Sequence, residues 1–159
     1  GEVQVARVEA PAEWRAILVL PKDFMETSKT TKARAVLPAI YARTDVVTNL
    51  QAVAMLGLAF AQSRGDLLKA AMTDRVHQPY RLAICPLLPK LLPLAGHHGI
   101  LGVALSGAGP AVLAVIESEA AVDEASRTIH DAVKAIQRPE LLVCRFQAEG
   151  TCAVQMATN

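Results

Sequence analysis

The longest run of the chain without a charged side chain covers residues 91–116, and it is long enough to cross a bilayer as a single helix. It contains two prolines and five glycines, which in a lone helix surrounded by lipid would leave backbone groups without hydrogen-bond partners. Two strongly apolar runs within it, at 100–106 and 111–116, are separated by the glycine-rich segment 107–110. The stretch therefore predicts two buried strands joined by a glycine turn, and it does not predict a membrane span.

The overall composition predicts one folded domain without a nucleic-acid or membrane partner. Of the 159 residues, 52% are hydrophobic and 19% are charged, which is typical of a chain with a well-formed core and excludes a disordered one. The formal net charge is +1 and aromatic residues make up 4%, so neither a basic surface nor a base-stacking surface is expected. No basic segment followed by an apolar one opens the chain at Gly1, and we expect a cytoplasmic protein.

The three cysteines do not form a metal-binding or disulfide pattern. Cys85, Cys144 and Cys152 are an odd number, and the sequence has no C-x-x-C pair and no histidine at metal spacing around them. We therefore expect reduced thiols and no structural zinc.

The first half of the chain predicts one strand followed by several helices. The apolar residues 14–20 end at a proline and indicate a buried strand. A helix is expected from an N-cap at Ser28 toward Pro38, and shorter helices over 66–72 and 85–94. Between them, one long helix is predicted by apolar residues that recur at helical spacing: Val46, Leu50, Val53, Leu56 and Phe60.

The second half predicts a helix and further strands that complete an α+β fold. Ser118 precedes a helix whose apolar side chains share one face, namely Val122, Ala125, Ile129, Ala132, Val133 and Ile136. Apolar runs at 141–148 and 151–156 are expected to be strands. The order strand, helical insert, strand, strand, helix, strand is that of the split β-α-β unit of ferredoxin-like folds, with extra helices in the first crossover. We expect a single domain over residues 1–159.

The glycine turn is the first candidate for a binding site. Ser106, Gly107 and Gly109 lie between two apolar strands, where glycines allow close approach of the backbone and consecutive N–H groups can face phosphate oxygens. The alternative is a tight turn without a ligand. The segment is not a Walker loop, because it lacks the G-x-x-x-x-G-K-[ST] pattern and leads into a strand.

Two other segments hold side chains suited to an anionic ligand. Thr30 and Arg34 are one helical turn apart, so a hydroxyl and a guanidinium can face the same carboxylate or phosphate. Arg81 follows a Pro-Tyr break, which restricts its backbone, and Asp74 and His77 can pair across one turn. Taken singly, each segment is equally compatible with ordinary charges on a solvated surface.

In combination, the three segments resemble the C-terminal half of homoserine kinases. These enzymes belong to the GHMP superfamily of galactokinases, homoserine kinases, mevalonate kinases and phosphomevalonate kinases. The resemblance extends over about residues 14–154, and it rests on the runs TTKARAVLP, DRVHQPYR and GILGVALSGAGPAVLAVI. The glycine loop is shared widely in the superfamily, whereas the T-x-x-x-R and D-x-x-x-x-P-Y-R elements point to homoserine kinases.

The resemblance implies roles for individual residues. Arg34 and Arg81 match the two arginines that hold the carboxylate of the amino-acid substrate in such kinases. Thr30 matches a hydroxyl near the transferred phosphate. The loop that closes the active site beneath the nucleotide phosphates is matched by Ser106, Gly107 and Gly109.

The resemblance also implies an activity in which this chain is one of two parts. The expected reaction transfers the γ-phosphate of ATP to the hydroxyl of L-homoserine, with Mg²⁺, on the route to threonine. The nucleotide loop of the family, a P-x-x-x-G-L-x-S-S run, does not occur in this sequence. We therefore expect an N-terminal kinase domain, absent from this chain, to bind most of the ATP and Mg²⁺. We assign no catalytic residue and no metal ligand to this chain, and we expect the chain alone to be inactive. Exposed strand edges would allow it to form a homodimer.

Two alternatives remain at this point. The chain could be a free-standing ferredoxin-like module that binds or senses an amino acid without chemistry, because this fold carries many unrelated functions. It could also be half of a related kinase for a sugar or an isoprenoid precursor. A sugar substrate has no carboxylate and so does not require a pair of arginines.

Overall fold

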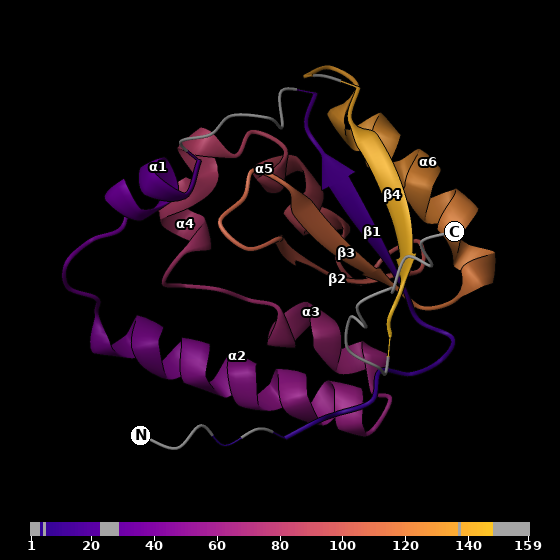
Figure 1. Cartoon of the computed structure of the whole chain (residues 1–159), viewed down its shortest axis with the longest axis horizontal. Coiled ribbons are helices and arrows are strands. Elements are labelled where there is room, and N and C mark those ends of the chain that lie inside the picture. Colours follow the sequence, from indigo (N-terminus) through magenta and orange to yellow (C-terminus); the bar gives the residue numbers. More distant parts are fainter. Residues whose placement is uncertain (1–3, 5, 23–28, 137, 148–159) are drawn as a thin grey trace, which may run out of the picture.

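The computed structural model describes residues 4, 6–22, 29–136 and 138–147, and these residues form one antiparallel sheet with helices around it. The sheet has the order β2-β3-β1-β4 and contains β1 Arg15–Leu20, β2 Ile100–Leu105, β3 Val112–Ile116 and β4 Glu140–Arg145 (Figure 1). Every neighbouring pair of strands is antiparallel. This order, with helices after β1 and after β3, is that of a ferredoxin-like α+β fold, and it confirms the predicted class.

Most helices lie in the first crossover, between β1 and β2. They are α1 Lys29–Ala35, α2 Arg43–Ala61, α3 Leu68–Ala71, α4 Gln78–Arg81 and α5 Leu88–Leu91, whereas α6 Val122–Val133 follows β3. Single 3-10 turns extend them at η1 Gly65–Leu67, η2 Leu82–Ile84, η3 Leu92–Leu94 and η4 Glu119–Ala121. The helix expected over 85–94 is split into α5 and η3, because Pro89 and Pro93 cannot donate a helical hydrogen bond. The expected N-cap Ser28 and the expected strand 151–156 lie outside the described residues.

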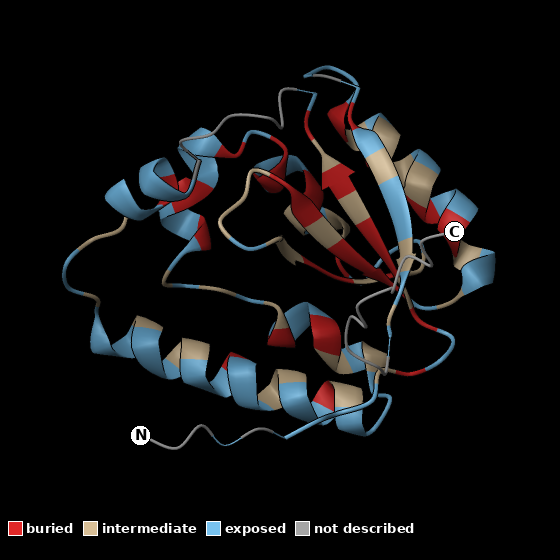
Figure 2. Ribbon diagram, viewed as in Figure 1, coloured by how far each residue is buried: buried red, intermediate tan, exposed pale blue. Residues whose placement is uncertain are grey.

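Helix α6 covers one face of the sheet through the apolar stripe that its spacing predicts. Its buried side chains are Val122, Ala125, Ile129 and Val133, and they share a core with Ile17 and Val19 of β1, with alternate residues of β3, and with α5. Ile136, beyond the end of α6, is exposed. Burial of this stripe supplies the main hydrophobic core (Figure 2).

The opposite face of the sheet packs against the C-terminal half of α2 and against α3. Trp14 and Val115 lie on this face, and they form a second core with Ala59 and Leu68. The ring of Phe60 packs edge-on against that of Trp14, with 5.2 Å between the ring centroids. This contact holds the end of α2 against the sheet.

The N-terminal half of α2 has an exposed apolar surface, which the spacing of its residues did not indicate. Val46, Leu50 and Val53 are 39%, 66% and 64% exposed, and within the helix only Ala52 and Ala59 are buried. Apolar residues occupy nearly every side of α2, so their spacing predicts the helix without identifying its buried face. By length and composition alone α2 is able to cross a membrane, which is weak evidence because helices of soluble proteins pass the same test.

The cysteines of the described residues are free thiols. Cys85 is buried, and this burial raises the pKa of its thiol, an effect that the nearby charge of Arg81 opposes. Cys144 in β4 is partly buried, and Cys152 lies outside the described residues. At neutral pH the raised pKa keeps Cys85 protonated, which is typical of a packing residue and not of a nucleophile.

Candidate functional site

The three segments singled out in the sequence meet at one end of the sheet. A cavity of about 360 Å³ lies between α1, α4 and the turn that joins β2 to β3. It is lined by Thr30, Arg34, Asp74, His77, Gln78, Arg81, Ala104, Leu105, Gly107 and Ala108. Of the candidate residues, Thr30, Arg34, Arg81 and Gly107 therefore share one cavity, whereas Ser106 and Gly109 lie in the turn without lining it.

Arg81 connects the parts of this cavity. Its side chain is only 8% exposed, although it is charged. The Nε atom donates a hydrogen bond to the carbonyl oxygen of Ala33 in α1 (3.2 Å), and Nη1 donates to the carbonyl oxygen of Gly107 in the turn (3.3 Å). Arg81 thus links α1 to the glycine turn, and its charge stays beside the cavity.

Arg34 has the opposite character. It is exposed, and no hydrogen bond or ion pair joins its side chain to any other residue in the described part of the chain. A guanidinium group offers five donors in a planar fork that matches two oxygens of a carboxylate or phosphate. Arg34 is therefore the cation of this cavity that is available to an anionic ligand.

Asp74 forms the turn that begins α4. Its carboxylate accepts hydrogen bonds from the backbone N–H groups of Val76 (2.8 Å), His77 (2.9 Å) and Gln78 (3.3 Å), and it also contacts Nδ1 of His77 at 3.2 Å. The expected pairing of Asp74 with His77 is confirmed. Because its oxygens are occupied by three backbone donors, Asp74 stabilises the backbone that carries Arg81.

The glycine turn leaves two amide groups available. Ser106 donates to the carbonyl oxygen of Ala111 (2.9 Å), and Gly109 donates to that of Ser106 (3.2 Å). In the described residues the N–H groups of Gly107 and Ala108 donate to no acceptor. Two successive amides without an acceptor are suited to bind an anionic oxygen, which is consistent with the phosphate-binding turn that the sequence suggested.

Gly107 and Gly109 both have positive φ angles, of +61° and +81°, but their surroundings differ. A Cβ atom at Gly109 would lie 2.8 Å from Sγ of Cys85 and 3.1 Å from Cδ2 of Leu105, whereas a Cβ at Gly107 would meet nothing within 4 Å. We expect Gly107→Ala to cost about 1–2 kcal/mol of unfolding free energy through its backbone conformation alone. Gly109→Ala should cost about 1–3 kcal/mol more through overpacking. Urea unfolding of both variants measures the difference, and equal losses would contradict the packing described here.

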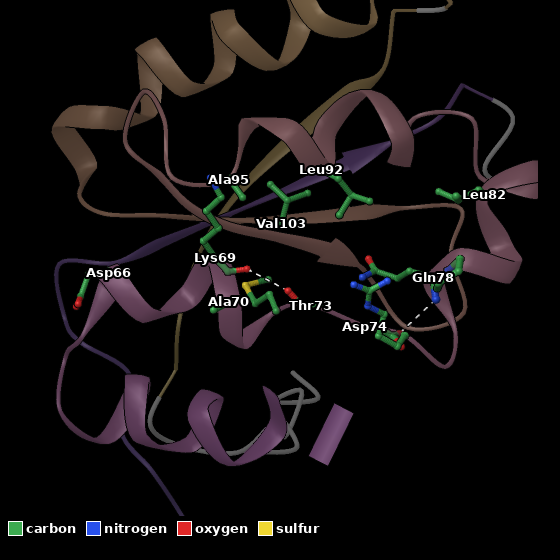
Figure 3. A pocket seen from close by; sticks show the side chains of 13 residues that line it. Asp66, Lys69, Ala70, Thr73, Asp74, Gln78, Leu82, Leu92, Ala95 and Val103 are labelled. Atoms are coloured by element: carbon green, nitrogen blue, oxygen red, sulfur yellow. Dashed lines mark hydrogen bonds between the residues drawn. The ribbon is translucent and has the colours of Figure 1, made fainter. Parts of the chain in front are cut away.

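A larger cavity of about 670 Å³ adjoins the first (Figure 3). It lies between α3, α4, η3 and the edge strand β2, and Val103 and Met72 contribute to its apolar wall. Asp74 and Gln78 line both cavities and so form part of the wall between them. Gln78 appeared in the sequence only as one letter of the DRVHQPYR run, and no feature of the sequence indicated this position.

The described residues contain no group of three or more histidine, cysteine, aspartate or glutamate side chains that could hold a metal ion. The basic and amide donors around the smaller cavity are suited to anions instead.

Comparison with known proteins assigns the family. The family described as GHMP kinases C terminal matches residues 58–135. Homoserine kinase of Deinococcus radiodurans is 42% identical over 125 residues, which is 79% of this chain and 40% of that protein. Homoserine kinase of Schizosaccharomyces pombe is 44% identical over 115 residues, which is 69% of this chain and 33% of that protein. The chain thus spans less than half the length of these relatives.

Solved structures share the fold. The crystal structure of homoserine kinase from Cytophaga hutchinsonii superposes with a TM-score of 0.81 at 24% identity, covering 92% of this chain and 46% of that one. Phosphomevalonate kinase from Streptococcus pneumoniae gives a TM-score of 0.60 at 15% identity. Together with the family match and the sequence matches, these likenesses show that the chain contains a GHMP kinase C-terminal domain, homologous to that of homoserine kinases.

Proposed function

We propose that this chain is the substrate-binding, C-terminal part of a homoserine kinase. Such an enzyme moves the γ-phosphoryl group of ATP to the side-chain hydroxyl oxygen of L-homoserine, giving O-phospho-L-homoserine and ADP with release of the hydroxyl proton. The observation that supports this most is the exposed, unpaired Arg34 in a cavity that it shares with Thr30, Arg81 and the glycine turn. The matches to homoserine kinases point to the same reaction.

The residues that line the cavity support the roles that we propose for them. Arg34 binds the substrate carboxylate through two parallel N–H donors. Arg81 donates hydrogen bonds to the carbonyl oxygens of Ala33 and Gly107. It therefore adds positive charge to the cavity and holds α1 next to the glycine turn. Thr30 and the free amides of Gly107 and Ala108 offer donors to the phosphoryl oxygens. Phosphoryl transfer depends mainly on positioning and on charge stabilisation, which are the contributions these groups can make.

A second domain completes this proposal. ATP would supply the phosphoryl group, and Mg²⁺ would neutralise part of its charge. We assign the binding of both mainly to an N-terminal kinase domain that is not part of this chain. The exposed apolar side of α2, formed by Val46, Leu50 and Val53, offers a surface for such a domain. We also propose that the protein is cytoplasmic and that it can form a homodimer. The other GHMP substrates are less well supported, because the likeness to phosphomevalonate kinase is in the fold alone.

The test is an activity assay of the native-length protein with ATP and Mg²⁺. L-Homoserine should be phosphorylated, and 2-amino-1,4-butanediol, which has a hydroxymethyl group in place of the carboxylate, should react poorly. Production of O-phospho-L-homoserine can be followed by ³¹P NMR and by release of ADP. Preferred turnover of a sugar or of phosphomevalonate would overturn the proposed substrate.

The mass of the native polypeptide separates the kinase from a binding module. An antibody raised against this chain should detect a band at about twice 16.9 kDa in extracts of the source cells, as expected from the relatives' greater length. A band at 16.9 kDa itself would contradict the two-domain kinase and favour an amino-acid-binding module.

A further inference from the structure

Gln78 is a buried polar residue in the wall of the cavity. It is only 5% exposed, and it begins the short helix α4 that also carries Arg81. Its side-chain Oε1 accepts a hydrogen bond of 2.9 Å from the backbone N–H of Leu105, at the end of the edge strand β2. Its own backbone N–H donates to Asp74. Because backbone and side chain are both held, the amide group has a defined orientation.

The orientation leaves one donor without a protein partner. The N–H of Leu105 can only donate, so the oxygen of the Gln78 amide must face it and Nε2 must point away. Within the described residues Nε2 has no hydrogen-bond partner, and no fully buried side-chain nitrogen or oxygen there lacks one. It follows that Nε2 is the atom of Gln78 that reaches the open space of the cavities. An amide donor that faces a cavity can donate to water or, when a ligand is bound there, to an acceptor on that ligand.

The charges around the two cavities indicate on which side that ligand lies. The larger cavity is lined by two acidic and two basic residues, namely Asp66, Asp74, Lys69 and Arg75. The smaller one is lined by Arg34 and Arg81, whereas its single carboxylate, Asp74, is occupied by backbone donors. Leu105, which orients the amide, also lines only the smaller cavity. An anionic ligand is therefore favoured in the smaller cavity.

We propose that Nε2 of Gln78 donates a hydrogen bond to a carboxylate oxygen of the substrate, so that Gln78 and Arg34 hold the carboxylate from two elements. This inference rests on the proposed homoserine kinase function and assigns one more residue to the same site. An amide nitrogen cannot accept a hydrogen bond, so Nε2 of Gln78 does not bind the substrate ammonium group. Arg81 is three positions after Gln78 in α4, which places both on one side of that helix.

The substitution Gln78→Glu removes the donor and adds a negative charge, but it keeps the acceptor. A glutamate can still accept the hydrogen bond from Leu105, but it presents a negatively charged oxygen where Nε2 was. In the native-length protein we expect KM for L-homoserine to rise about 10- to 100-fold, with a smaller change in kcat. The melting temperature should stay close to that of the wild type. The same substitution at exposed Gln51 is the matched control and should leave KM unchanged.

A second measurement observes the amide group itself. Titration with L-homoserine should shift the side-chain ¹⁵N–¹H signals of Gln78, whereas 2-amino-1,4-butanediol should leave them in place. Gln78→Met removes both hydrogen bonds, so it should lose stability as well as binding, and Gln78→Glu should lose only binding. This contrast separates a substrate contact from a purely structural role.

The outcomes distinguish the inference from the function on which it rests. If the wild type binds L-homoserine and Arg34→Ala weakens it, but Gln78→Glu binds normally or the Gln78 signals do not move, the inference fails and the function stands. If inorganic phosphate, and not L-homoserine, moves the Gln78 signals, the donor serves a phosphoryl group and the inference is again overturned. If the wild type binds no L-homoserine, the proposed function fails together with the inference.

Discussion

Replacing Arg34 with alanine in the native-length protein should lower kcat/KM for L-homoserine by an amount equivalent to about 2–5 kcal/mol. The side chain is exposed and has no partner in the described part of the chain, so its loss should remove the proposed contact with the substrate and little else. The unfolding free energy should therefore change by less than about 0.5 kcal/mol. Steady-state kinetics and urea unfolding of the same preparation measure both quantities.

Arg81→Ala provides the contrast. Because Arg81 is buried and donates to the carbonyl oxygens of Ala33 and Gly107, its removal leaves two acceptors without a donor. We expect this variant to lose stability by about 1–3 kcal/mol in addition to activity. A near-normal KM for L-homoserine in Arg34→Ala would remove the assigned role of that arginine, whatever happens to Arg81→Ala.

Gly102→Val should strongly destabilise the protein. A Cβ atom at Gly102 of β2 would contact Sδ of Met72 and lie 3.1 Å from the backbone carbonyl oxygen of Leu68 in α3. The methionine side chain can move, but the backbone of α3 can do so only by shifting the helix away from the strand. We expect a loss of about 3 kcal/mol of unfolding free energy, at the upper end for overpacking.

The matched control is a glycine with free space around it. Gly57 lies within α2, and in the described part of the chain no atom other than those of its chain neighbours and of its own helix backbone lies within 4 Å of the position that a Cβ would occupy. Gly57→Ala should raise the unfolding free energy by about 1 kcal/mol, because alanine is the better helix former. Urea denaturation of both variants provides the test. A valine at Gly102 that leaves the unfolding midpoint unchanged would mean that α3 does not lie against β2 as described.

The local patterns predicted the strands and α6 well, and α2 only in part. Each predicted strand in the described residues was found, because apolar runs bounded by glycine or proline are determined by short-range chemistry. The stripe of α6 identified its buried face, because polar residues occupy the other side. In α2, apolar residues lie on nearly all sides, and the helix leaves Leu50 and Val53 exposed. Which side of such a helix is buried depends on its neighbours.

The functional site, like the fold, was predicted only in part. Its residue types were indicated by three short segments and by their resemblance to homoserine kinases, but no single segment showed that the three meet. Arg81 is 48 residues from Ala33 and 26 residues from Gly107, and only folding brings these groups within hydrogen-bond distance. The tertiary structure also distinguished the two arginines, since Arg81 is a buried link whereas Arg34 is exposed and has no partner among the described residues.

By itself, the sequence determined the α+β class, the order of the elements and the family, because these depend on periodicity and on short motifs that act locally. Only the tertiary structure decided that Nε2 of Gln78 has no partner among the described residues and that Ser106 and Gly109 do not line the cavity. The physical reason is that hydrogen-bond partners and cavity walls are supplied by residues distant in the chain. Their positions follow from the packing of helices on the sheet and not from any neighbouring residue.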